Sequence, residues 1–377
     1  MKHHKYTPLL LYAYPSLAHH FAHIPLGSFP TPVISMPLLS SRYTNVTLYY
    51  KHDGLCGRRN EYGNVLFGGN KVRKLEFLLA HAQAHDKTTV VTFGCAGSNH
   101  VVATAAYAQH LGITCIGMLK PQANSIFVRR NLALMSHYNA KLYYYPSSGL
   151  RALGTSELFS MHKRIFKKTP YLITTGGSQP LGVLGFVNAA FELKEQIMRG
   201  ELPEPQYIYV ATGSLGTVTG LLLGCKAAKL ASKIVAVMIE PSDQHACRQA
   251  IKSLFMETNR LLHHYTPAFP LFTLTSQELI VRTESAGYDY GLITPDALHA
   301  LQQASLWEQI NLDPTYTAKA LDALLKDAAC GFLHGSTALF WHTYDGTNFD
   351  HLTHNFDFHA LHPSLHHYFI NSTISDH

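Results

Sequence analysis

Three cationic side chains, Lys71, Arg73 and Lys74, follow the turn Gly68-Gly69-Asn70. An apolar helical spacing comes next, at Leu75, Leu78, Leu79 and Ala82. Lys71 therefore lies at a predicted helix start, where the helix dipole and the neighbouring cations disfavour the charged form of its amine. A neutral lysine amine is a nucleophile, and the cations also suit a bound anion. The alternative is a solvated basic first turn without chemistry.

Ser98, Asn99 and His100 stand between a predicted strand and a predicted helix, after a turn that ends at Gly97. A serine hydroxyl, an asparagine amide and the N–H groups of a helix start form an anion site that suits a carboxylate. An ordinary helix N-cap has the same pattern, so the local sequence leaves both interpretations open.

The segment Thr212 to Thr217 also joins a predicted strand to a predicted helix, and its inner residues are Gly213, Ser214, Leu215 and Gly216. Glycines allow a close approach of the backbone, and the helix start provides N–H donors for a phosphate. The segment is neither a Walker P-loop nor a Gly-x-Gly-x-x-Gly motif. A phosphate cradle and an ordinary turn both fit it.

Short apolar strands alternate with helices through most of the chain. We expect strands at 47–51, 88–93, 114–119, 140–145, 171–174, 207–211, 234–239 and 337–343. We expect the later helices near 101–111, 128–132, 153–167, 180–198, 218–230, 246–264, 294–307 and 318–329. This alternation predicts βαβ units and a parallel sheet, with ligands bound at the carboxyl ends of the strands. Residues 1–22 show no clear periodicity.

Composition describes a globular chain and excludes several classes of function. The 377 residues are 46% hydrophobic and 14% charged, enough for two domains and a large core. The net charge of +6 is scattered without a Lys/Arg run, so we expect no nucleic-acid partner. The 25 histidines form dispersed pairs without converging Cys or carboxylate neighbours, which argues against a dedicated metal site.

Cysteine usage and hydropathy point to a cytoplasmic protein that does not bind membranes. The six cysteines have no CxxC spacing, which favours free thiols in a reducing compartment. No apolar run approaches the roughly 20 residues of a membrane span. The apolar stretch near the N-terminus is broken by Pro8 and Pro15, which argues against a secretory signal.

The run Gly-Gly-Asn-Lys-Val-Arg-Lys-Leu-Glu-Phe at 68–77, followed by Gly-Ser-Asn-His at 97–100, resembles a family of pyridoxal-phosphate enzymes. That family comprises 1-aminocyclopropane-1-carboxylate (ACC) deaminases and D-cysteine desulfhydrases. The resemblance extends from about Leu26 to Thr343, and 175–186 and 312–320 also carry it. It implies that pyridoxal phosphate is the cofactor, that Lys71 forms the Schiff base with it, and that Lys74 approaches its phosphate.

The resemblance also implies roles for the other candidate residues. Asn99 would contact the phenolic oxygen of the cofactor, and Ser98 would lie near substrate. Thr343 would offer its hydroxyl to the pyridine nitrogen. The active-site tyrosines would be Tyr290 and Tyr316, and the phosphate turn would comprise Gly213, Ser214, Leu215, Gly216 and Thr217.

The chain departs from the family pattern at several positions within these motifs. Gly97 stands where the family has glutamine, and Leu215 stands where it often has glycine. Tyr344-Asp345 replaces a Gly-Gly pair. Thr317, which follows the second tyrosine, is the residue type of the desulfhydrase-like branch, whereas ACC deaminases have glutamate there.

The fold that the resemblance implies is α/β, the two-domain, open parallel-sheet fold of the tryptophan-synthase-β-like (fold type II) pyridoxal-phosphate enzymes. The larger, cofactor-binding domain would comprise 1–79 and 170–345, and a smaller inserted α/β domain would comprise 80–169. Residues 346–377 would form a peripheral tail, and the protein would be a homodimer.

Three functions follow as hypotheses. The first is a desulfhydrase that acts on D-cysteine, a small amino acid, and gives pyruvate, sulfide and ammonia. The second is an ACC deaminase that gives 2-oxobutanoate and ammonia. The third is a cofactor-binding homologue without turnover.

Overall fold

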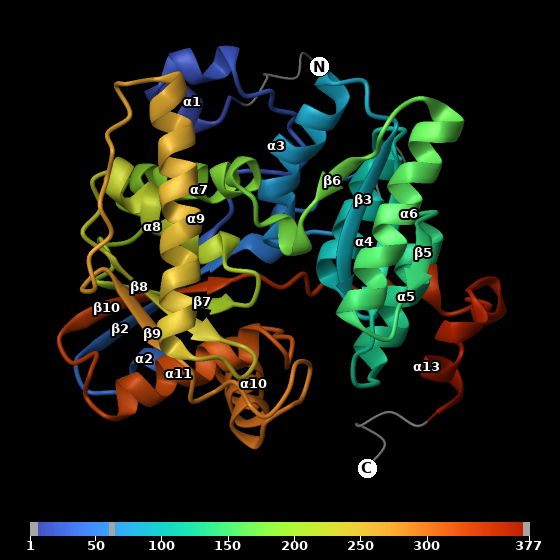
Figure 1. Cartoon of the computed structure of the whole chain (residues 1–377). Helices are drawn as coiled ribbons and strands as arrows, with labels where there is room; N and C mark the ends of the chain where they lie inside the picture. Colours follow the sequence, from blue (N-terminus) through green and yellow to red (C-terminus); the bar gives the residue numbers. More distant parts are fainter. Residues whose placement is uncertain (1–6, 60–64, 372–377) are drawn as a thin grey trace.

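The computed structural model describes residues 7–59 and 65–371, and it contains two separate β-sheets that lie in different halves of the molecule (Figure 1). The larger sheet has the order β1-β2-β10-β7-β8-β9. Its strands are β1 (Val33–Ser35), β2 (Val46–His52), β7 (Tyr207–Thr212), β8 (Lys233–Met238), β9 (Leu279–Arg282) and β10 (Ser336–His342). All its pairs are parallel except β1–β2, so the expected parallel α/β architecture is confirmed with one antiparallel edge strand.

The smaller sheet is wholly parallel and has the order β5-β4-β3-β6. Its strands are β3 (Thr89–Cys95), β4 (Thr114–Lys120), β5 (Lys141–Tyr144) and β6 (Tyr171–Ile173). They occupy the chain between β2 and β7, so this sheet is an insertion in the sequence of the larger one. Its last strand, β6, lies beyond residue 169, where we expected the smaller domain to end.

Helices cover both faces of the larger sheet. One face packs against α1 (Leu9–Ala13), α7 (Pro180–Met198), α8 (Gly216–Ala227) and α9 (Gln244–Tyr265). The other face packs against α2 (Pro37–Ser40), α10 (Pro295–Glu308) and α11 (Thr317–Ala329). The strands of a sheet that is buried on both faces are nearly continuous apolar runs. For this reason β7 and β8 could be predicted from the sequence.

The smaller sheet is covered in the same way by fewer helices. The helices α3 (Lys71–Ala84), α4 (Asn99–His110) and α5 (Ile126–His137) share one apolar cluster. On the other face, α6 (Ser148–Phe166) packs through Leu158 against Val91, Ile116 and Met118.

The segment expected to be a tail contains α12 (Asp350–Thr353) and α13 (His367–Ile370), and it lies against α5 (Figure 1). Four of its apolar side chains are buried in the cluster around α3, α4 and α5: Phe349, Leu361, Leu365 and Tyr368. The segment therefore completes one face of the smaller sheet.

A buried network of charges fixes α3 against the larger sheet. The Arg73 guanidinium donates to Asp53 Oδ1 at 2.7 Å and to Glu192 Oε2 at 2.9 Å. Lys51 Nζ donates to Glu192 Oε1 at 2.6 Å. Burial alone would raise the pKa of Glu192, but Arg73 and Lys51 hold that pKa well below its usual range. The network therefore joins α3 to β2 and α7.

Removing one member of this network should destabilise the protein strongly. Glu192→Ala leaves two buried cations without their shared partner, and we expect a loss of about 3–5 kcal/mol in the free energy of unfolding. Urea unfolding followed by circular dichroism measures it. Glu195→Ala, on the same helix, removes only an exposed pair with Arg199 at 4.0 Å and should cost under about 1 kcal/mol. Equal losses in the two variants would contradict the role given to the network.

Candidate functional site

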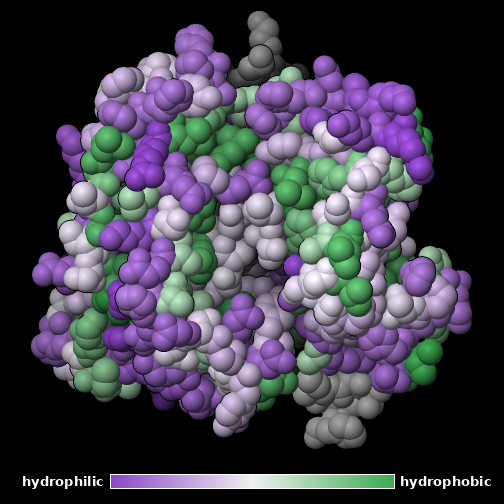
Figure 2. All heavy atoms as spheres, viewed as in Figure 1, coloured by the Kyte–Doolittle hydropathy of each residue, from purple (hydrophilic) through white to green (hydrophobic). Residues whose placement is uncertain are grey.

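A cavity of about 620 Å³ lies between the two sheets, where β3, β7 and β10 end. Figure 2 shows the hollow near the centre of this face. Most of the candidate residues line the cavity: Lys71, Ser98, Asn99, Gly213, Ser214, Leu215, Thr217, Tyr290, Tyr316 and Thr343. Lys74 and Gly216 do not line it, but they donate hydrogen bonds to the carbonyl oxygens of two residues that do, Gly176 and Ser214. Residues that are up to 272 positions apart in the numbering (Lys71 and Thr343) therefore meet at the carboxyl ends of the strands.

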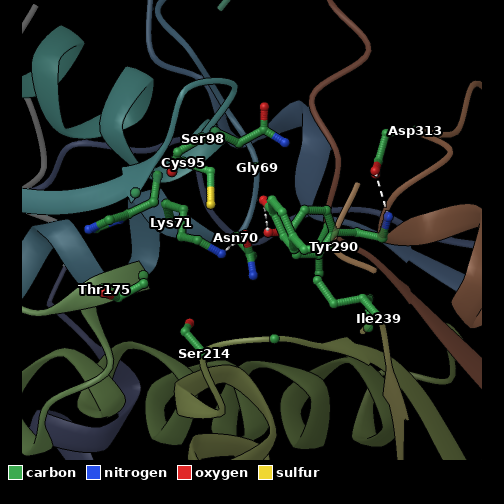
Figure 3. Close-up of a pocket in the computed structure, with 18 of the residues that line it drawn as sticks. Gly69, Asn70, Lys71, Cys95, Ser98, Thr175, Ser214, Ile239, Tyr290 and Asp313 are labelled. Atoms are coloured by element: carbon green, nitrogen blue, oxygen red, sulfur yellow. Dashed lines mark hydrogen bonds between the residues drawn. The ribbon is translucent and has the colours of Figure 1, made fainter. Parts of the chain in front are cut away.

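The turn before α3 is seated against the end of β10. Gly69 has φ +84°, and a Cβ there would lie 2.7 Å from the carbonyl oxygen of Thr343, so this position requires glycine. Asn70 N donates to the same oxygen at 3.2 Å. These contacts place Lys71 at the first position of α3, with its side chain in the cavity (Figure 3).

Asn70 connects the lysine to the turn before α8. Lys71 Nζ donates to Asn70 Oδ1 at 3.0 Å, and Asn70 Nδ2 donates to Thr217 Oγ1 at 3.0 Å. Its side chain makes no cap to its own helix. The asparagine instead orients the lysine amine within the cavity.

Burial lowers the pKa of Lys71 to about 8, and Asp313 partly opposes that shift. The expected direction of the shift is right, but its main cause is burial and not the neighbouring cations that we expected. Residues two apart on a helix point to different sides, and Arg73 faces the buried network described above. Lys74, one turn along, shares the face of Lys71, and burial followed by the charge of Lys71 holds the pKa of Lys74 well below its usual range.

Lys74 lies behind a cradle of small polar groups. Its Nζ donates to the carbonyl oxygen of Gly176 at 3.0 Å and to Ser178 Oγ at 3.3 Å. The Gly216 N–H, at the start of α8, donates to the same Ser178 oxygen at 3.1 Å. Within the described residues Lys74 has no ion pair with a carboxylate. A buried lysine amine beside a helix N-terminus is an environment that suits a phosphate, whose negative charge would favour the protonated amine.

The backbone conformation at Leu215 explains why the family often has glycine at this position. The residue has φ +67°, a left-handed conformation that is unusual for a leucine. Gly216 is more restricted, since a Cβ there would lie 2.5 Å from Ser178 Oγ and 2.7 Å from Lys74 Nζ. Ser178, which follows the short 3-10 helix Thr175–Gly177, was not singled out from sequence, although the glycine-rich turn 175–179 after a strand was a signal for it.

Ser98 is the N-cap of α4, and its Oγ accepts from Val101 N. Asn99 Oδ1 accepts from Asn131 Nδ2 at 2.7 Å. The N-cap interpretation is thereby confirmed. Both residues also line the cavity, and the anion site stays a prediction for the same place. The Cβ of an alanine at Gly94 would lie 2.4 Å from Ser98 Cβ, which shows how closely the end of β3 approaches this helix start.

Two tyrosine hydroxyls meet at the opposite wall. Tyr290 OH and Tyr316 OH are 2.7 Å apart. Burial raises the pKa of each hydroxyl, so both stay protonated near neutral pH. Asp313 fixes the second tyrosine, because its carboxylate accepts from the N–H groups of Thr315 and Tyr316 at 3.0 and 2.7 Å.

Thr317 and Asp345, two residues at which the family motifs vary, form hydrogen bonds within the protein. Thr317 is fully buried, donates its hydroxyl to Asp313 Oδ2 at 2.8 Å, and does not line the cavity. It therefore cannot mark substrate preference by contact. Asp345, in place of a family glycine, accepts from Gly68 N at 2.6 Å and holds the turn before Lys71.

The profile of the family described as "Pyridoxal-phosphate dependent enzyme" matches residues 24–343, which is most of the chain. The chain belongs to this family. Its cofactor is pyridoxal phosphate, and the cavity fits that group: Lys71 offers a buried amine, and Lys74 with the start of α8 offers a place for the phosphate.

The chain is similar to several named enzymes over nearly the whole length of those enzymes. A putative ACC deaminase of Pyrococcus abyssi is 30% identical over 329 residues, which is 87% of this chain and 93% of the relative. A D-cysteine desulfhydrase of Salmonella typhimurium is 28% identical over 345 residues, covering 85% and 97%. The crystal structure of an ACC deaminase homologue superposes with a TM-score of 0.74 at 28% identity, covering 89% and 94%. The fold type II architecture is thereby confirmed.

No helix among the described residues is both long enough and apolar enough to span a membrane. In the same residues, no cluster of histidine, cysteine and carboxylate side chains has the geometry of a metal site.

The rate of cofactor attachment should depend on pH in the way that the lowered pKa of Lys71 sets. The neutral amine becomes abundant as pH rises through about 8, instead of the usual 10.5. The rate at which apoprotein gains visible absorbance with pyridoxal phosphate should therefore rise up to about pH 8 and then level. Lys71→Ala should not gain it, and borohydride reduction with peptide mapping should find the label on Lys71. A label on another lysine would refute the assignment.

The cradle can be tested with two neighbouring substitutions. Gly216→Ala places a methyl group against Ser178 and Lys74, and it should weaken cofactor binding by at least about tenfold. Leu215→Gly relieves a left-handed leucine and should leave the dissociation constant nearly unchanged. Spectral titration of the apoproteins measures both constants. If the Gly216→Ala protein binds pyridoxal phosphate as tightly as the Leu215→Gly protein does, the phosphate lies elsewhere.

Proposed function

We propose that the protein is a D-cysteine desulfhydrase-type lyase, which converts D-cysteine and water to pyruvate, hydrogen sulfide and ammonia. The observation that carries the proposal is the buried Lys71 amine, which shares one cavity with the phosphate cradle and the start of α4. Relatives named D-cysteine desulfhydrase that match 85% of the chain support the choice of substrate.

Pyridoxal phosphate supplies an electron sink for a carbanion at the α-carbon of an amino acid. The residues of this chain would do the rest. Lys71 Nζ, neutral above about pH 8, takes the α-proton. The start of α4, with Ser98, holds the substrate carboxylate. Loss of the β-thiolate then follows, and water releases pyruvate and ammonia.

The protonated tyrosine pair suits the same reaction. Tyr290 and Tyr316 share a hydrogen bond at 2.7 Å in the wall of the cavity, so one of the two hydroxyl protons is available to a leaving group. Thr343 also lines the cavity, and we assign its hydroxyl to the pyridine nitrogen. A neutral hydroxyl there makes the electron sink weaker than a carboxylate would, which is sufficient when thiolate is the leaving group.

ACC deamination is the second candidate, favoured by the named relative of Pyrococcus abyssi and by the superposed structure. ACC has no α-hydrogen, so its ring must open by attack or proton removal at a ring carbon. Thr317 donates its hydroxyl to Asp313 and does not line the cavity. The choice between the two substrates therefore rests on other residues, which do line it.

We also propose a cytoplasmic homodimer. All six cysteines are free thiols, as a reducing compartment requires. The helix α6 exposes Leu153, Ile165 and Phe166, which are more than half accessible. Such apolar side chains suit a surface that pairs with a second copy. A monomeric mass by light scattering, or fractionation away from the cytoplasm, would refute these assignments.

A substrate panel tests the function. With D-cysteine, purified holoenzyme should release equal amounts of sulfide and pyruvate, and it should give little 2-oxobutanoate from ACC. L-Cysteine serves as the stereochemical control, and Lys71→Ala should reduce turnover at least about 1,000-fold because the base is lost. Efficient ACC turnover with inert D-cysteine would favour the deaminase. A coloured protein that turns over nothing in the panel would favour a cofactor-binding homologue.

A further inference from the structure

Gln122 places an amide between the two walls of the cavity. It follows β4 in the smaller sheet and lines the cavity. On one side, a Cβ at Gly97 would lie 3.1 Å from its Oε1 and 3.2 Å from its Nε2. On the other side, a Cβ at Gly291 would lie 3.2 Å from its Nε2. The glutamine therefore occupies space that two glycines leave open.

The orientation of this amide is fixed by its partner. Gly97 N–H donates to Gln122 Oε1 at 3.0 Å, which fixes the amide oxygen as the acceptor and leaves the NH₂ group as a donor. Among the residues that the structure describes, none accepts a hydrogen bond from Nε2. An amide donor is thus left beside Gly97, immediately before Ser98 and the start of α4.

We infer that Gln122 is a substrate-binding residue whose Nε2 donates to the carboxylate of the bound amino acid. The inference rests on the proposed function, which places that carboxylate at the start of α4. It adds a donor from a different element, the loop after β4, to the serine and N–H groups of α4 itself.

Tyr368 holds the glutamine from outside the span that the family profile matches, 24–343. Its hydroxyl accepts from Gln122 N at 3.0 Å, and its carbonyl oxygen accepts from Arg129 Nε at 2.8 Å. The tyrosine is 1% exposed and is buried in the apolar cluster around α4 and α5. We assign Tyr368 as a positioning residue that acts on substrate through Gln122.

Gln122→Glu separates substrate binding from a structural role. The glutamate can still accept from Gly97 N–H, but it loses the donor and brings a negative charge toward the carboxylate. Alanine binding to the holoenzyme, followed by the change in the visible spectrum, should weaken about 10- to 100-fold. Ethylamine, which is alanine without its carboxylate, should bind this variant as it binds the wild type. Gln83→Glu makes the same change at an exposed site on α3 and should alter neither affinity.

Each result decides the matter. Unchanged alanine affinity in Gln122→Glu, or equal losses for alanine and ethylamine, would overturn the inference while leaving the proposed function intact. A wild-type holoenzyme whose spectrum responds to no amino acid would overturn both. If Gln122→Glu does not fold, Gln122→Ala provides the comparison, with weaker alanine binding and unchanged ethylamine binding expected.

Tyr368→Phe tests the positioning role. It should weaken alanine binding in the wild-type background, by a smaller factor than Gln122→Glu, and should have no further effect in Gln122→Ala. Ethylamine binding should stay unchanged in both backgrounds. Equal losses in the two backgrounds would show that Tyr368 acts on the fold in general and not through Gln122.

Discussion

The burial of Arg73 between two carboxylates is the constraint on which the cavity depends. An unpaired guanidinium in this interior would be prohibitively unfavourable, so α3 can pack only where Asp53 and Glu192 meet it. Asp53 also accepts from Trp341 Nε1 at 2.8 Å, which brings β10 into the same network. Because Lys71 lies two residues before Arg73, fixing the arginine on one side of α3 fixes the lysine on the other, beside the end of β10.

The same interior that stabilises Arg73 through its partners disfavours the charged forms of Lys71 and Lys74, which form no ion pair with a carboxylate among the described residues. Burial lowers the pKa of both, and for Lys71 that shift is useful because a neutral amine is the reactive form. For Lys74 the penalty is relieved when a phosphate occupies the cradle. A cofactor that binds only the folded chain also stabilises it by mass action, so reactivity and stability are coupled at this helix start.

Local pattern was enough to predict the elements that carry the chemistry. The start of α3, the alternation of β3 to α8 and the turn at 212–217 all follow from periodicity and glycine placement. The short strands β1 and β9, of three and four residues, carry too little pattern for that. The side of α3 that Arg73 faces was predictable in principle, since residues i and i+2 of a helix do not share a face. Contacts between distant residues were not, and these include Ser178 with Gly216 and Tyr368 with Gln122.

The departures from the family motifs are local changes that distant residues accommodate. Tyr344, in place of a glycine, accepts from Arg130 Nη1 at 2.9 Å, and its neighbour Asp345 accepts from the N–H of Gly68. The space above Gly97 is filled by an amide from another loop, and that loop is held by the C-terminal segment. That segment is thus tied to the cavity wall by side chains that no motif near Lys71 reveals. The identity of the cofactor follows from residues close to the lysine, whereas the shape of the substrate site depends on segments that the cofactor need not contact.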